Sequence, residues 1–95
     1  MSDNIEIQCV QKSERNNPYE RILSIGGVDP DGKPWKMSEG FAIDGIKNGR
    51  YRFYVNLGGR ALDVIIAKSQ HGHEYLKTHA DGEEPTNLLL LPECP

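Results

Sequence analysis

The chain contains 95 residues and carries a formal net charge of −3 at neutral pH, with charges of both signs scattered along it. This length indicates a single domain, residues 1–95, with an adequate but small core. The mild negative charge argues against strong non-specific attraction to nucleic acid or to an anionic membrane.

The N-terminal segment has no basic stretch followed by an apolar one, so no secretory signal is expected. The longest apolar run, Leu88–Leu91, is too short to cross a bilayer. We therefore expect a cytoplasmic protein in which Cys9 and Cys94 stay reduced. Cys9 continues an alternating apolar pattern and is expected to be a buried, unreactive thiol. Two cysteines without histidines do not make a closed zinc site.

Two strands are predicted in the first third of the chain. From Ile5 to Cys9, apolar residues recur at every second position, as in a strand. A polar loop is expected at 13–18. Arg21–Ile25 is predicted as a second strand that ends at Gly26-Gly27. Residues 29–34 are dense in turn formers and predict an irregular, exposed connection.

A short helix is expected next. Ser38 has the chemistry of an N-cap, with Glu39 in the first turn, and Asn48-Gly49 supplies a C-terminal stop. Glycines inside the helix make it intrinsically weak, so it must be stabilised by packing on the sheet, and Gly45 indicates a close approach there. The apolar side chains that form one helical stripe are Met37, Phe41, Ala42, Gly45 and Ile46.

The hairpin that follows has a register that can be derived from the sequence. Strands Tyr51–Leu57 and Arg60–Lys68 flank Gly58-Gly59, which suits a two-residue turn. This register places large apolar side chains opposite one another on one face, whereas a slip by one residue breaks the match. The predicted opposed pairs are Val55 with Leu62, Phe53 with Val64 and Tyr51 with Ile66.

A second hairpin joins Arg60–Lys68 to a strand at Glu74–Thr78. A three-residue loop with Gly72 in the left-handed conformation pairs Ile66 with Leu76 and Lys68 with Glu74. The alternative, a two-residue turn, would place Ile66 opposite a lysine.

The tail contains a turn at 81–85 and then the run Leu88–Leu91, closed by Pro92. The run is expected to form a short strand or a single helical turn pressed on the sheet, or to dock on a second copy of the chain. An exposed run of four leucines is rare in soluble monomers, so we expect it to be buried, and truncation before Leu88 to unfold the protein.

These elements predict an α+β fold: a small antiparallel sheet of about five strands, in the order β-β-α-β-β-β, with one short helix packed on one face. No internal repeat or domain boundary is present.

An ordered set of short motifs runs through almost the whole chain from Ile5 to Pro95. The set comprises Ile25-Gly26-Gly27, Trp35 with Ser38, Ala42-Ile43, Phe53-Tyr54-Val55, Gly58-Gly59, Tyr75-Leu76-Lys77-Thr78, Asp81-Gly82, Asn87-Leu88-Leu89, and Leu91-Pro92 with Cys94. In this order the motifs resemble the domain-of-unknown-function 3892 family of short, mainly bacterial proteins. The resemblance implies a compact, self-standing domain and no particular activity.

The outward face of the central hairpin combines basic and aromatic side chains. Its candidate binding residues are Arg50, Arg52, Tyr54, Tyr75 and Lys77. Such a face can bind a protein partner or a second protomer, since Tyr and Arg are common hot-spot residues. It can also stack bases and neutralise phosphates of a single-stranded nucleic acid. The structural alternative is that Arg52 pairs with Asp63 and packs on Tyr54.

Trp35 precedes the helix, in the loop bounded by glycine and proline, and is a further candidate binding residue. It either plugs the edge of the core or anchors a ligand.

No catalytic residue, metal ligand or cofactor is predicted. His71, His73 and His79 lack ligand spacing, and the serines lack the elbow of a hydrolase. Glu83-Glu84 is expected to be exposed surface, and the paired glycines are expected to be turns. We therefore expect a non-enzymatic protein-interaction module. Single-stranded nucleic-acid binding is the alternative, and an enzyme dependent on a metal or a small molecule is a third, weaker one.

Overall fold

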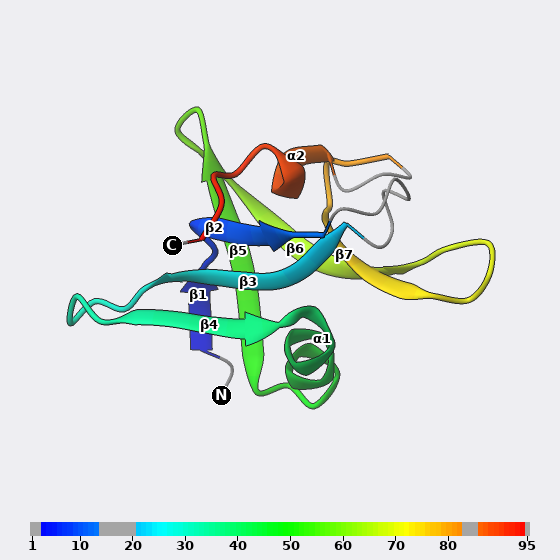
Figure 1. The fold of residues 1–95 in the computed structure, drawn as a ribbon, viewed down its shortest axis with the longest axis horizontal. Coiled ribbons are helices and arrows are strands. Elements are labelled where there is room, and N and C mark those ends of the chain that lie inside the picture. Colours follow the sequence, from blue (N-terminus) through cyan, green and yellow to red (C-terminus); the bar gives the residue numbers. More distant parts are fainter. Residues whose placement is uncertain (1–2, 14–20, 83–85, 95) are drawn as a thin grey trace.

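The computed structural model describes residues 3–13, 21–82 and 86–94. Within these ranges the chain forms strands β1 (Asp3–Glu6), β2 (Cys9–Lys12), β3 (Ile22–Val28), β4 (Pro34–Ser38), β5 (Tyr51–Leu57), β6 (Arg60–Lys68) and β7 (Glu74–Thr78), and helices α1 (Glu39–Lys47) and α2 (Thr86–Leu89). The strands make a four-stranded sheet, in the order β1-β5-β6-β7, and a three-stranded sheet, in the order β2-β3-β4. The three-stranded sheet runs across β5 and encloses the core with it (Figure 1).

The α+β class is confirmed, but the strands form two sheets instead of one sheet of about five strands. The predicted first strand divides at Ile7 and Gln8. The Ile7 N–H donates to the Tyr54 carbonyl at 2.8 Å, and the Gln8 N–H donates to the Gly26 carbonyl at 2.8 Å. Adjacent residues therefore belong to different sheets. The alternating pattern could not reveal this, because alternation indicates an extended backbone without identifying its partner.

The segment before α1 also differs from the prediction. Trp35 lies in β4, opposite Gly27 of β3, and not in a loop. The turn is confined to Asp29–Lys33, where the Asp29 N–H bonds the Lys33 carbonyl at 2.8 Å. Gly26-Gly27 is likewise no turn but part of β3. The predicted loop at 13–18 and the end of the predicted turn at 81–85 lie largely outside the described residues.

Both hairpins of the four-stranded sheet are confirmed. Gly58 and Gly59 have φ angles of 59° and 82°, as a two-residue turn with positive φ requires, and Val55 lies opposite Leu62. The paired stretch of β5 and β6 ends at Tyr54 and Asp63, so the other two predicted opposed pairs lie beyond it. From Val64 onward β6 pairs with β7, with Ile66 opposite Leu76 and Lys68 opposite Glu74 as predicted.

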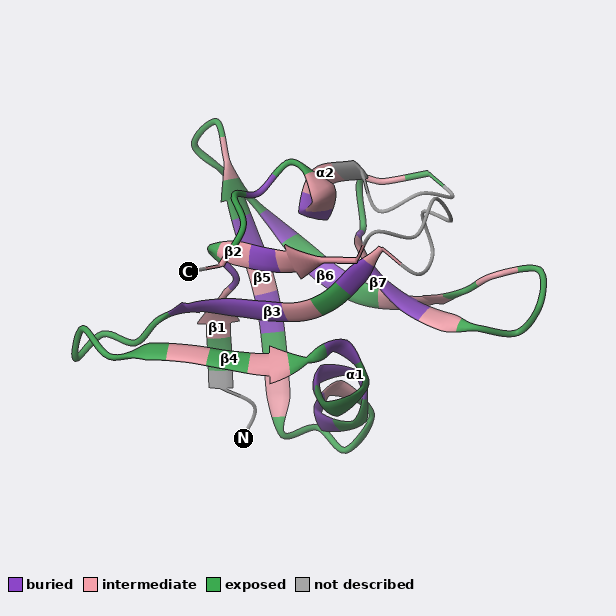
Figure 2. Ribbon diagram, in the orientation of Figure 1, coloured by how far each residue is buried: buried purple, intermediate pink, exposed green. Residues whose placement is uncertain are grey.

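The inward face of these strands is dry, as the alternation predicts. Phe53 and Val55 are fully buried, Leu62 and Val64 nearly so, and Asp63, between the last two, is exposed (Figure 2). One cluster joins the inward side chains of both sheets. It contains Ile7, Val10, Ile22, Ile25, Ala42, Ile43, Phe53, Val55, Leu62, Val64, Leu76, Leu88 and Leu91.

Helix α1 begins and ends where the sequence indicates. The Ser38 Oγ accepts a hydrogen bond from the Phe41 N–H at 3.1 Å, and Gly49 has a φ of 71° after the C-cap. The helix contacts β3 and β4 of one sheet and β5 and β7 of the other. The close approach predicted at Gly45 is present, since a Cβ there would overlap the ring of Tyr51.

Two charged side chains of α1 reach β7, which is an edge strand. The buried Glu39 carboxylate accepts a hydrogen bond from the Leu76 N–H at 3.2 Å. At the other end of the helix, Lys47 Nζ lies 2.6 Å from the Glu74 carboxylate. Burial raises the pKa of Glu39 to about 7, although the bond from Leu76 opposes this rise. The hydrogen bond from Lys47 lowers the pKa of Glu74.

The leucine run begins in the helical turn α2 and continues into the turn after it, and two of its side chains enter the core. Leu88 is fully buried and Leu91 is 7% exposed, whereas Leu90 is 69% exposed. Helix α2 contacts β7 and β2, so it joins the two sheets on the inward side and does not cover the outward face of β5. The Asp81 carboxylate fixes it by accepting bonds from the Thr78 N–H, the Thr78 hydroxyl and the Asn87 N–H.

The segment after α2 runs along the free edge of β2. The Val10 N–H donates to the Pro92 carbonyl at 3.0 Å, and the Cys94 N–H donates to the Val10 carbonyl at 3.1 Å. A disulfide between Cys9 and Cys94 closes this contact. The chain is thereby linked covalently across 85 residues.

Candidate functional site

The outward face of β5 holds part of the predicted basic and aromatic surface. Arg50 and Arg52 are exposed, and Tyr54 is half-buried. β1 lies beside β5 in parallel, with Asn4 opposite Arg52 and Glu6 opposite Tyr54. The face is therefore polar and of mixed charge.

The predicted surface does not extend to β7 as an exposed face. Tyr75 is only 3% exposed, so its prediction as an exposed contact residue is wrong. Its place opposite Ala67 follows from the register, but alternation assigns a side chain to a face without showing what covers it. Lys77 is half-buried, and its Nζ donates to the Gly82 carbonyl at 2.8 Å.

A hollow of about 290 Å³ brings Tyr54 together with another predicted residue, Trp35. Trp35 comes from β4 and Tyr54 from β5, so the two sheets contribute one aromatic side chain each. The carboxylate-bearing residues Glu6 and Asp29 lie in the same lining. The remaining lining residues are Asn4, Ile5, Gln8, Val28 and Pro30.

Trp35 is both a core residue and a wall of this hollow. Its ring stacks on Phe53, with 6.2 Å between the ring centroids, and it is half-buried. Gly27 makes room for it, because a Cβ there would lie 3.1 Å from the indole Nε1 and 2.8 Å from the Glu6 carbonyl oxygen. Of the two predicted roles, plugging the core edge is therefore shown, and the hollow leaves the anchoring role open.

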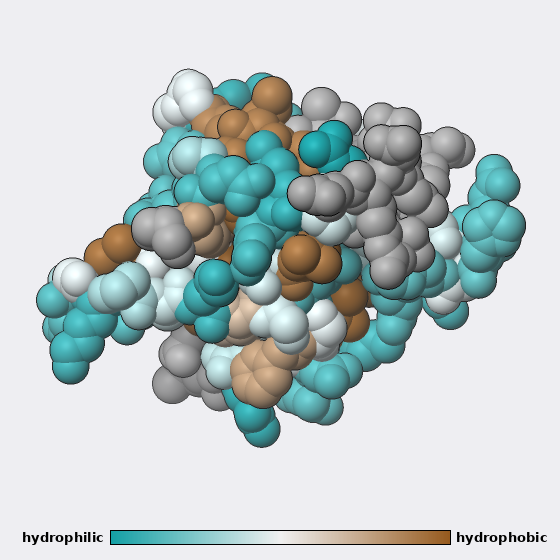
Figure 3. Space-filling view, viewed as in Figure 1, coloured by the Kyte–Doolittle hydropathy of each residue, from teal (hydrophilic) through white to brown (hydrophobic). Residues whose placement is uncertain are grey.

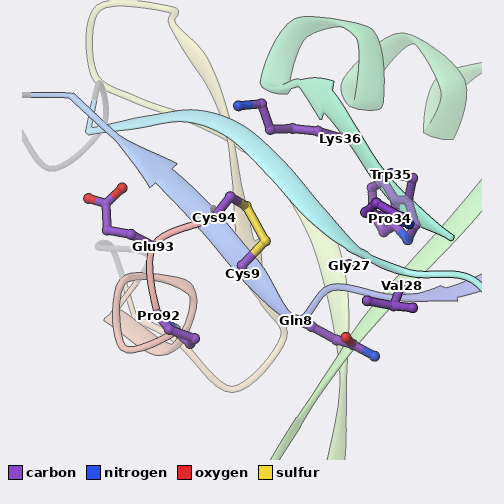
Figure 4. A pocket seen from close by; sticks show the side chains of 10 residues that line it. All are labelled: Gln8, Cys9, Gly27, Val28, Pro34, Trp35, Lys36, Pro92, Glu93 and Cys94. Atoms are coloured by element: carbon purple, nitrogen blue, oxygen red, sulfur yellow. A yellow bond between two sulfur atoms is a disulfide. The ribbon is translucent and has the colours of Figure 1, made fainter. Parts of the chain in front are cut away.

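A second and larger hollow, of about 420 Å³, lies beside the disulfide. Figure 4 shows the Cys9–Cys94 bond between Pro92 and Glu93 on one side and Val28 and Pro34 on the other. The strand beneath it is bare of side chain at Gly26, where a Cβ would lie 3.0 Å from both sulfur atoms. The glycine therefore lets the disulfide rest directly on β3.

The expectation of two reduced thiols is wrong for this structure, because Cys9 and Cys94 form the disulfide. The cysteines lie near opposite ends of the chain, and no spacing rule relates such distant positions. Gly26 accommodates the two sulfur atoms, but a glycine in the sequence does not reveal what approaches it.

The three histidines lie in the connections before and after β7. His71 and His73 lie in or beside the β6–β7 loop, His79 follows β7, and all three are exposed. Among residues 3–13, 21–82 and 86–94, no group of three or more His, Cys, Asp or Glu side chains is placed to hold a metal ion. Glu83-Glu84 lies outside the described residues.

In the view of Figure 3, hydrophilic atoms cover most of the surface, and hydrophobic atoms gather over α2 and the turn after it. Leu90, at 69% exposed, is the most exposed large apolar side chain in the described part of the chain. None of the helices there is long and apolar enough to cross a membrane.

The fold and these hollows define a small α+β domain in which two sheets share one core and a disulfide joins the ends of the chain. The chain belongs to a family described as protein of unknown function, DUF3892, which matches residues 6–92. Comparison with curated proteins and with solved structures finds no match.

Proposed function

We propose that this chain is a non-enzymatic interaction module that binds a partner protein through the outward face of β1 and β5 and the adjoining Trp35–Tyr54 hollow. The observation that carries the proposal is the meeting of these two aromatic side chains with two acidic residues, Glu6 and Asp29, in one hollow. Aromatic rings and carboxylates together favour a cation. The partner would therefore present a basic side chain.

The exposed Arg52 extends this surface and suits an acidic group beside the partner's basic one. It lies next to Tyr54 along the same outward face, two residues away. A partner surface with both signs of charge complements this arrangement, and such complementarity sets register and specificity. The cytoplasm of a bacterium remains the proposed setting, by the family's mainly bacterial membership.

Single-stranded nucleic acid is the second candidate, supported by the exposed Arg50 and Arg52. The burial of Tyr75 and the bond of Lys77 to the Gly82 carbonyl leave fewer groups to stack bases and neutralise phosphates. Carboxylates in the hollow would repel phosphates. The protein partner is therefore the stronger proposal.

The partner's chemistry is tested by titrating the chain with a lysine- and arginine-rich peptide and with an acidic peptide of equal length. Fluorescence of Trp35, the one tryptophan in the sequence, reports binding. We expect saturable binding of the basic peptide alone, and about 5–10-fold weaker binding by the Glu6→Gln/Asp29→Asn variant. Asp31→Asn is the matched control, because Asp31 lies in the same turn outside the lining. Equal response to both peptides, or to neither, contradicts the proposal.

The face itself is tested with Arg52→Ala/Tyr54→Ala, which should abolish partner capture in a pull-down and leave folding intact. Unchanged capture counts against this face. Retardation of single-stranded oligonucleotides at low salt that disappears steeply at high salt would favour the second candidate instead.

A further inference from the structure

We propose that the Cys9–Cys94 disulfide is a reversible thiol–disulfide exchange site, open to a cellular dithiol, whose reduction releases the C-terminal segment from the edge of β2. The proposal does not rest on the partner surface, although Trp35 and Val28 line both hollows. It rests on the accessibility of the sulfurs, on the weak attachment of the segment that they hold, and on the separate anchoring of α2.

The disulfide borders a hollow, and neither cysteine belongs to the core cluster. Both cysteines are half-buried and line the 420 Å³ hollow beside β2 and β3. On the side of β3 the sulfurs rest on the backbone at Gly26, so a thiolate would approach from the hollow. Exchange needs a thiolate to reach a sulfur atom, and the hollow that both cysteines line is where it would approach.

Among the described residues, the segment that the disulfide holds has few other attachments. Pro92 and Glu93 are exposed, and the backbone contact to β2 consists of the Val10–Pro92 and Cys94–Val10 hydrogen bonds. Without the disulfide these two bonds must compete with water. The segment should then separate from β2.

Helix α2 is anchored separately, so release need not unfold the domain. Leu88 and Leu91 precede the segment and are buried in the core cluster. The Asp81 carboxylate also accepts a hydrogen bond from the Asn87 N–H at 3.1 Å. Reduction is therefore expected to act locally, exposing the edge of β2 at Val10 and leaving the core intact.

The exchange is balanced in two steps. A thiolate of the dithiol forms a bond with one Sγ, and the electron pair of the Cys9–Cys94 bond goes to the other, which leaves as a thiolate. The second thiolate of the dithiol then attacks the mixed disulfide and releases the remaining cysteine. The dithiol is oxidised to a disulfide, the chain gains two electrons, and its thiolates take up two protons to become thiols.

The test treats the folded, oxidised chain with dithiothreitol at neutral pH, without denaturant, and then with iodoacetamide. We expect rapid addition of two carbamidomethyl groups. Hydrogen exchange should accelerate at least tenfold at the Val10 and Cys94 amides, while the Val55 amide in β5 stays protected. The Cys9→Ser/Cys94→Ser variant should show the same exchange pattern and no response to dithiothreitol.

Three outcomes overturn the inference. Resistance to reduction until denaturant is added makes the disulfide a sealed structural link. Loss of protection throughout the core on reduction shows global unfolding in place of local release. A chain that stays fully oxidised in glutathione mixtures as reducing as a cytoplasm is not under redox control.

Trp35 fluorescence gives a second readout of reduction, because Trp35 lines the hollow beside the disulfide.

Discussion

Glu39 places a carboxyl group between α1 and the edge of β7, where water is largely excluded. Its carboxylate satisfies the Leu76 N–H, which would otherwise be a buried donor without a partner. Burial nevertheless penalises the charged form and raises the pKa of Glu39 from 4.5 to about 7. Glu39 therefore accepts a hydrogen bond from the backbone of an edge strand and also makes the free energy of unfolding depend on pH near neutrality.

The sign of this dependence follows from the raised pKa. Below pH 4.5 the side chain is neutral in both the folded and unfolded states, and its contribution to stability is complete. That contribution is lost as pH rises toward and through about 7, because the unfolded chain releases the proton more readily. Above that pH the loss amounts to at most about 3 kcal/mol.

Glu39→Gln keeps an oxygen acceptor for the Leu76 N–H and removes the titration. The variant should gain stability relative to the native chain as pH rises from 4.5 to 8, and urea unfolding at several pH values measures this difference. Glu74→Gln is the control of opposite sign. The pKa of Glu74 is lowered, so its charge stabilises the fold at neutral pH and the variant should be less stable there. A pH-independent difference for Glu39→Gln would contradict the assignment.

At the scale of elements, α2 and the turn after it show how four adjacent leucines divide their roles. A helical turn directs successive side chains to different sides, so Leu88 and Leu91 enter the core while Leu90 points outward. The predicted burial of the run is confirmed for these two residues. The side chains join the cluster between the sheets and leave the outward face of β5 accessible.

Leu88→Ala and Leu90→Ala form a matched pair that tests this division. Leu88→Ala should lower the free energy of unfolding by about 2–5 kcal/mol, because it removes packed atoms and leaves a cavity. Leu90→Ala should change it by no more than about 0.5 kcal/mol. Chemical denaturation of both variants measures the difference. Equal effects would contradict the burial of Leu88 and the exposure of Leu90.

At the scale of the whole molecule, the disulfide nearly closes the chain into a ring. Cys9 and Cys94 are separated by 85 residues, so the link removes much of the freedom of the unfolded chain. On the chain-entropy argument this stabilises the folded state by up to about 4–5 kcal/mol, a large share of the total expected for a domain of this size.

The Cys9→Ser/Cys94→Ser variant should therefore unfold at lower urea concentration than the oxidised chain, with a loss of up to about 4–5 kcal/mol. The reduced native chain should behave like the variant. A midpoint that does not change on reduction would show that the link contributes nothing to stability.

Local chemistry determined the elements of this protein. Paired glycines with positive φ set the β5–β6 hairpin, Gly72 with a φ of 82° set the β6–β7 loop, and Ser38 set the start of α1. Alternation also identified the dry side of β5 and β6, because a one-residue slip would expose every core side chain. Such features depend on neighbours in the sequence and can be predicted from it.

Only the tertiary structure decided which elements pair and which side chains are covered by other parts of the chain. The division between Ile7 and Gln8, the pairing of β4, the burial of Tyr75 and the Cys9–Cys94 bond all depend on residues far apart in the chain. The Trp35–Tyr54 hollow exists because the two sheets cross. Local propensity and residue spacing do not predict such contacts, because the free energy of these contacts arises only when distant segments meet.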